Sequence, residues 1–161
     1  MAVHRLHLEE EDDDFALFAI HCGEAPFKMA FLMNQSLRWQ LKRQREDALV
    51  IRSGIHQQFP KFRFVSRHNH VDHLLLTNVG YSEQTAPEQS LGLFDTFTGS
   101  STSTSYLMPE FKKVDYLLKI ESALTKDEEK QLIRQIKSIK EVVSTYAIPH
   151  QKIKNTNPLN N

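Results

Sequence analysis

The side chains best suited to chemistry lie together at residues 67–73, which read R-H-N-H-V-D-H. Imidazole and carboxylate groups are common zinc ligands, and a zinc ion with an open coordination position activates water for hydrolysis. The spacing H-x-H-x-D-H marks His68, His70, Asp72 and His73 as candidate ligands of a Zn²⁺ ion, catalytic or adventitious. The competing interpretation is a polar hairpin turn, because alternation along an extended strand places His70 and Asp72 on one face and His73 on the other.

A second set of candidate residues lies at 108–116, which read M-P-E-F-K-K-V-D-Y. Glu110 and Asp115 could face a ligand as an acidic pair, and buried carboxylates would then have shifted pKa values. They could instead accept hydrogen bonds from backbone N–H groups or from Arg43 while their apolar neighbours fill the core. We favour this structural role.

The only cysteine, Cys22, follows His21 at the end of an apolar run. A reactive cysteine–histidine pair needs the two side chains together, but adjacent strand residues point to opposite faces. The sequence therefore predicts a packed, inert thiol. A single cysteine also forms no intramolecular disulfide, which fits a reducing compartment.

Composition and charge exclude several classes of function. The chain has 161 residues, 40% of them apolar, and its 20 basic and 20 acidic side chains give a net charge of zero. That balance exerts no general attraction on nucleic acid or on an anionic membrane. No apolar run is long enough for a signal peptide or a membrane span, so we expect a cytoplasmic protein of one domain.

The elements that must position these residues begin with the apolar run at 15–22, which predicts a strand buried on both faces. Pro26 suits the first position of a helix. Helical spacing gives this helix an apolar face at Phe27, Ala30, Phe31, Asn34 and Leu37, which Met29, Leu32 and Met33 widen. A buried Asn34 needs a hydrogen-bond partner, which we expect on a neighbouring strand.

The middle of the chain predicts strands and one long loop. Alternation favours a strand at 38–44 that 47–51 continues, whereas 53–58 is loop-like. A hairpin is expected with arms at 61–66 and 71–79, joined through 67–70, where Asn69 tolerates a positive φ. Residues 80–105 predict a long mobile loop with a short apolar anchor.

The last third combines a strand, a capped helix and a second strand. Alternation within 108–121 predicts a strand. Thr125 and Glu128 form a T-x-x-E capping box at the start of an amphipathic helix. A β-prone run at 142–148 predicts the final strand, and the polar residues 149–161 predict a disordered tail.

This order favours an α+β class. The simplest arrangement is a ferredoxin-like two-layer sandwich, a mostly antiparallel sheet with two helices on one face and a long loop insertion. We expect an acidic N-terminal lead-in at 1–14, one α+β domain at 15–148 with its mobile loop at 80–105, and the tail at 149–161.

The residues at 108–116 resemble the signature of the IPExxxVDY family, bacterial proteins of Bacteroidetes with no assigned activity. Pro109, Glu110, Val114, Asp115 and Tyr116 match the signature at its spacing, and Met108 replaces its isoleucine. The resemblance implies a Bacteroidetes source and a cytoplasmic setting, and it supplies no reaction or cofactor.

The spacing H-x-H-x-D-H also resembles the metal-binding motif of the metallo-β-lactamase superfamily, in which three histidines and an aspartate bind one or two metals after a strand. The resemblance stops at residues 67–73. Leu74 and Leu75 replace the small residues expected next, and no later histidine or aspartate is placed as a further ligand.

Three functions follow from these observations. We favour a non-enzymatic protein-interaction or binding domain with a protein partner or a second copy of itself, because no nucleophile–base arrangement, P-loop or dinucleotide fingerprint is present. A metal-dependent hydrolase using the histidine cluster is the first alternative. The second is RNA binding through a sheet face, where Phe62, Phe64 and Tyr116 would stack bases beside Lys61, Arg63 and Arg67.

Overall fold

The computed structural model describes residues 14–82 and 103–160. Its main element is a six-stranded sheet in the order β10-β1-β9-β6-β5-β2, in which every neighbouring pair is antiparallel. Its strands are β1 (Ala16–His21), β2 (Lys42–Arg43), β5 (Lys61–Val65), β6 (Asp72–Thr77), β9 (Tyr116–Ile120) and β10 (Ser144–Ala147). Two hairpins accompany it, β3 (Ala48–Arg52) with β4 (Ile55–Phe59) and β7 (Val79–Ser82) with β8 (Ser103–Tyr106). The α+β class and the mostly antiparallel sheet are confirmed.

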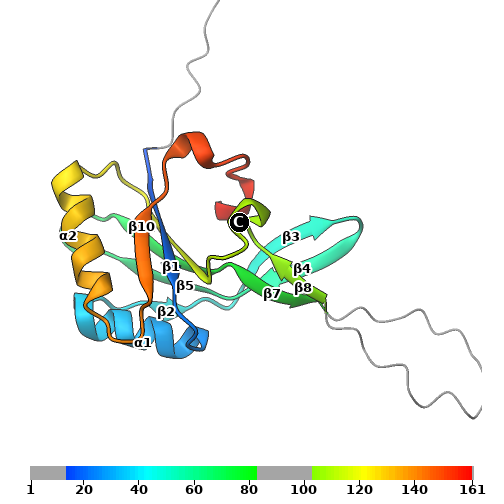
Figure 1. Cartoon of the computed structure of the whole chain (residues 1–161), viewed down its shortest axis with the longest axis horizontal. Helices are drawn as coiled ribbons and strands as arrows, with labels where there is room; N and C mark the ends of the chain where they lie inside the picture. Colours follow the sequence, from blue (N-terminus) through cyan, green and yellow to red (C-terminus); the bar gives the residue numbers. More distant parts are fainter. Residues whose placement is uncertain (1–13, 83–102, 161) are drawn as a thin grey trace, which may run out of the picture.

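Both predicted helices, α1 (Pro26–Leu37) and α2 (Lys126–Lys137), cover one face of the sheet (Figure 1). Pro26 occupies the first turn of α1, as predicted. The Thr125 side chain and Glu128 form the predicted reciprocal capping box at the start of α2. A first core lies under the helices, where Met29 and Ile136 pack on inward-facing strand residues such as Phe18.

The apolar face predicted for α1 is buried only in part. Phe27 and Phe31 are 69% and 57% exposed, whereas Met29, Ala30 and Met33 face the sheet. Periodicity alone did not separate the two faces, because apolar residues occupy both. Phe27 still contacts the core edge to face through Phe62, with ring centroids 5.5 Å apart.

A second core covers the opposite face of the sheet, so the molecule is not limited to two layers. Leu17 and Leu117 point to this side and pack beneath the β3–β4 hairpin and the C-terminal segment (Figure 1). Residues 149–160 therefore contradict the predicted disordered tail. They form the 3₁₀ helices His150–Lys152 and Asn157–Leu159, and Leu159 is 1% exposed. In addition, the Nζ of the buried Lys119 donates to Asn160 Oδ1 at 2.6 Å.

Three predicted segments have different local structures. Residues 53–58 were expected to be a loop, but Ser53 and Gly54 have φ values of 51° and 77° and turn the chain directly into β4. The predicted strand at 38–44 forms ladder pairs only at Lys42 and Arg43. The strand expected within 108–121 begins at Tyr116, after a 3₁₀ helix at Pro109–Phe111.

The predicted loop 80–105 is partly wrong, because its ends pair as β7 and β8. Its remainder, 83–102, lies outside the described residues, as does the acidic lead-in up to residue 13. Within the described residues, no helix has the length and apolarity needed to span a bilayer.

Candidate functional site

The structure does not gather the four predicted zinc ligands into one group. His68 and His70 lie exposed in the turn between β5 and β6, and Asp72 opens β6. Both carboxylate oxygens of Asp72 accept hydrogen bonds from Arg63, at 2.6 and 2.7 Å, and these bonds lower the pKa of Asp72. Across residues 14–82 and 103–160, no three His, Cys, Asp or Glu side chains are placed to hold a metal ion. Zinc binding remains a prediction.

His73 instead belongs to a cluster of three rings. It is 9% exposed, with its ring centroid 4.6 Å from that of Trp39 and 5.4 Å from that of Phe64. Trp39 and Phe64 stack with an interplanar angle of 22° and centroids 5.9 Å apart. The His73 Nδ1 lies 3.0 Å from the Val71 carbonyl oxygen, and this contact orients the imidazole ring. Burial lowers the pKa of His73 in spite of hydrogen bonds to the Val71 and Phe64 backbone.

This burial predicts that acid destabilises the fold through His73. Below about pH 6.5 the unfolded chain binds a proton that the folded, desolvated imidazole does not take up, so the stability present above that pH is lost as the pH falls. Urea unfolding at a series of pH values between about 7.5 and 5 should show this loss. The variant His73→Gln should have a shallower dependence, and an unchanged slope would contradict the assignment to His73.

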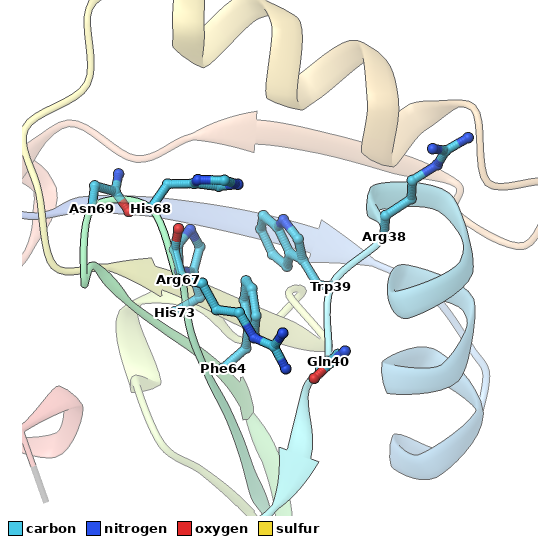
Figure 2. A pocket seen from close by; sticks show the side chains of 9 residues that line it. Arg38, Trp39, Gln40, Phe64, Arg67, His68, Asn69 and His73 are labelled. Atoms are coloured by element: carbon cyan, nitrogen blue, oxygen red, sulfur yellow. The ribbon is translucent and has the colours of Figure 1, made fainter.

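The three rings form the floor of a cavity of about 350 Å³ between two turns (Figure 2). One turn follows α1. Its first residue, Arg38, caps the helix in the left-handed region with a φ of 55°, and the chain then runs through Trp39 and Gln40 into β2. The other is the predicted connection between β5 and β6. It is closed by hydrogen bonds from His70 N to Ser66 O and from Ser66 N to Val71 O, both at 3.0 Å. Asn69 was expected to take the positive φ, but His70 does, at 56°.

The rim of the cavity is polar and positively charged. It carries Arg67, His68 and Asn69 on one side and Arg38 and Gln40 on the other, and the lining contains no acidic side chain. Arg63 pairs with Asp72 and Arg43 with Asp47, whereas neither Arg38 nor Arg67 forms an ion pair within the described part of the chain. In Figure 2 the guanidinium of Arg67 extends toward Gln40 and the imidazole of His68 extends toward Trp39. The guanidinium of Arg38 points away from the rings.

Residues 108–116, which resemble the family signature, form hydrogen bonds to distant parts of the backbone. Asp115 Oδ2 accepts a hydrogen bond from Cys22 N at 2.9 Å, and Glu110 Oε1 accepts one from Lys154 N at 3.2 Å. The Tyr116 hydroxyl donates to the Glu24 carbonyl oxygen. The backbone partners expected for the two carboxylates are thus present. Arg43, the alternative partner expected for these carboxylates, does not bind them, because its guanidinium pairs with Asp47.

The remaining signature positions contribute shape to the same region. Pro109 begins the 3₁₀ helix, where its missing N–H costs no hydrogen bond. Val114 is 1% exposed in the second core. Cys22, the neighbour of this network, is also buried, and burial raises the pKa of its thiol.

Asn78 is the residue of this region that sequence reasoning missed. It is fully buried, and its Nδ2 donates to Phe111 O at 2.8 Å and to Val114 O at 2.9 Å. Its Oδ1 accepts from Met108 N at 2.9 Å. One amide thereby holds both ends of the loop that carries Glu110. An asparagine at the end of a strand, separated by one residue from the apolar run Leu74–Leu76, was the available signal, but its partners lie 30 or more positions away.

The sheet face proposed for RNA stacking is not available. Phe62 and Tyr116 are 2% and 4% exposed in the core beneath the helices, because the alternation that aligns them with Phe64 also directs them inward. Of those three rings, only Phe64 reaches the cavity.

Trp39 and Gln40, read from the sequence as parts of a strand, are the cavity residues whose role was missed. Nothing local marks them, because the cavity forms only when the α1–β2 connection meets the β5–β6 turn.

Neither the family models, nor the curated proteins, nor the solved structures contain a match to this chain.

Proposed function

We propose that this protein is a small binding domain whose cavity over Trp39 takes a planar anion, and that it is not an enzyme. The observation that carries the proposal is the ring cluster of Trp39, Phe64 and His73 beneath a rim that holds arginines and no acid. The volume of about 350 Å³ falls within the range of sites that bind small organic molecules.

The cavity favours flat ligands over bulky ones. Aromatic rings attract other planar rings in stacked or edge-to-face arrangements, at separations like those inside the cluster. Since burial keeps His73 uncharged near neutral pH, the floor presents an apolar surface while Arg67 supplies positive charge at the rim. The nearby carboxylate of Asp72 is occupied by Arg63, which argues for binding rather than acid–base chemistry at this position.

Calorimetric titration with 2-naphthoate and with cyclohexanecarboxylate tests the proposal, because both are carboxylates and only the first is planar. We expect 2-naphthoate to bind the wild type at least tenfold more tightly, and Trp39→Leu to weaken its binding by about tenfold. Phe31→Leu, which alters an exposed ring on α1, is the matched control and should bind like the wild type. No binding of 2-naphthoate, or equal losses in both variants, would refute the proposal.

We also propose a ferredoxin-like core, membership of the IPExxxVDY family, a protein partner or homodimer, and a cytoplasmic location. A ferredoxin-like core is supported by the order β10-β1-β9-β6 with α1 after β1 and α2 before β10, which would make β2 and β5 additions. Membership of the IPExxxVDY family rests on the five matching positions. A protein partner, a homodimer and a cytoplasmic location rest on the sequence alone.

A further inference from the structure

We infer, on the basis of the proposed function, that the planar anion is a nucleotide whose base stacks on Trp39 and whose phosphate is held by Arg67. A nucleotide has three chemical features: a flat ring, hydrogen-bonding groups on the edge of that ring, and a phosphate. A different part of the cavity offers contacts for each of them.

The floor supplies the stacking surface. Trp39 is half-buried, so one part of its ring packs on Phe64 and His73 while another part faces the cavity. Nucleobases stack on such rings with little dependence on sequence, since every base has a π face. In Figure 2 the His68 imidazole extends over the same opening, where it can cover the outer face of a bound base.

The rim supplies the partner for the phosphate. Arg67 is exposed beside the cavity and forms no ion pair in the described part of the chain, in contrast to Arg63 on the strand before it. A guanidinium matches the geometry of phosphate oxygens and binds them through two parallel hydrogen bonds. The lining contains no acidic side chain, and the nearby carboxylate of Asp72 is paired with Arg63.

The side-chain amides of Gln40 and Asn69 supply groups for the base edge. Each amide carries both donors and an acceptor, the combination that base edges require, although Asn69 Oδ1 also accepts a long hydrogen bond from Val71 N at 3.4 Å. The two lie on opposite turns of the cavity, so a base stacked on Trp39 would have an amide on either side. This placement distinguishes a nucleotide from a plain aromatic carboxylate, which has no use for the amides.

Quenching of Trp39 fluorescence measures the binding directly, because Trp39 is the only tryptophan in the chain. The probes are AMP, adenosine, inorganic phosphate and a five-nucleotide oligoadenylate, each added to the full chain. We expect AMP to quench at a concentration at least about tenfold lower than adenosine does, because a charge-assisted contact is added. Phosphate alone should leave the fluorescence unchanged, since it does not cover the indole.

Two arginine variants identify the phosphate contact. Arg67→Gln should weaken AMP about tenfold and leave adenosine unchanged. Arg134→Gln removes the same charge from an exposed position on α2 and should bind both probes like the wild type. Tighter binding of the oligoadenylate than of AMP would assign the nucleotide to single-stranded RNA, and equal or weaker binding would assign it to a free nucleotide.

The outcomes separate this inference from the proposed function. If 2-naphthoate binds and neither AMP nor adenosine quenches Trp39, the nucleotide is wrong and the planar-anion cavity stands. If AMP and adenosine bind equally, or if Arg134→Gln weakens AMP as much as Arg67→Gln does, the phosphate contact is wrong. If 2-naphthoate also fails to bind, the proposed function falls with it.

Discussion

Replacing Asn78 with alanine should lower the free energy of unfolding by about 3–5 kcal/mol. The change removes three side-chain hydrogen bonds and leaves the carbonyls of Phe111 and Val114 and the N–H of Met108 without their partner. A buried polar group without a partner costs about 1–3 kcal/mol, and the position is fully buried, so water does not replace the amide easily. Urea unfolding followed by far-UV circular dichroism measures the loss.

The control is Gln131→Ala, which removes an exposed amide from α2 and should change the stability by less than about 0.5 kcal/mol. Asn78→Asp is a more specific test. It keeps the acceptor for Met108 N but places a carboxylate oxygen against the carbonyls of Phe111 and Val114, so it should be at least as destabilising as alanine. If Asn78→Asp retained wild-type stability, the bridging role of the amide would be wrong.

Deleting residues 149–161 should cost about 3 kcal/mol or more. The described part of this segment contributes Leu159 to the second core, stacks His150 on Phe15 with centroids 4.5 Å apart, and provides Asn160 to the buried ammonium of Lys119. Removing it exposes apolar surface on the sheet face that the helices do not cover. If the segment were disordered, its deletion would leave the free energy of unfolding unchanged.

A point substitution separates this packing from a general effect of shortening the chain. Leu159→Ala should lower stability by about 2–4 kcal/mol, because it leaves a cavity where a fully buried side chain was. Val143→Ala removes apolar atoms from a side chain that is 78% exposed and should be nearly neutral. Equal unfolding midpoints for Leu159→Ala and the wild type would show that the segment does not stabilise the sheet.

Local patterns predicted the elements whose formation depends on local interactions. The uniform apolar run of β1, the proline at the start of α1 and the capping box at Thr125 each carry a signal within a few residues, and each forms where expected. The β5–β6 hairpin was found for the same reason, since its arms and its turn are adjacent in the chain.

The misses depend on contacts between distant residues. Leu159 and Ile153 are the two aliphatic residues of a polar tail, and only the sheet face opposite the helices gives them a place in the second core. Phe27 and Phe31 have core spacing but lie on the outer side of α1, because Met29 and Met33 fill the inner side. The four candidate zinc ligands were grouped by their spacing in sequence, whereas in the fold the Asp72 carboxylate pairs with Arg63 and the His73 ring packs on Trp39.

The cavity over Trp39 was beyond sequence reasoning for the same physical reason. Its floor combines one residue after α1, one from β5 and one from β6, and the turn at Ser66–Val71 brings Arg67 to the rim. None of these segments has a motif of its own. The juxtaposition appears only once the two turns lie side by side (Figure 2).

The most direct test of the binding function is the indole N–H resonance of Trp39 in a proton–nitrogen correlation spectrum, because the single tryptophan gives a single indole signal. On addition of 2-naphthoate, we expect a saturable shift of this signal together with the backbone amides of Phe64 and His73, while the amide of Phe31 stays in place. A stationary indole signal, or shifts centred on α1 instead, would contradict a ligand site over Trp39.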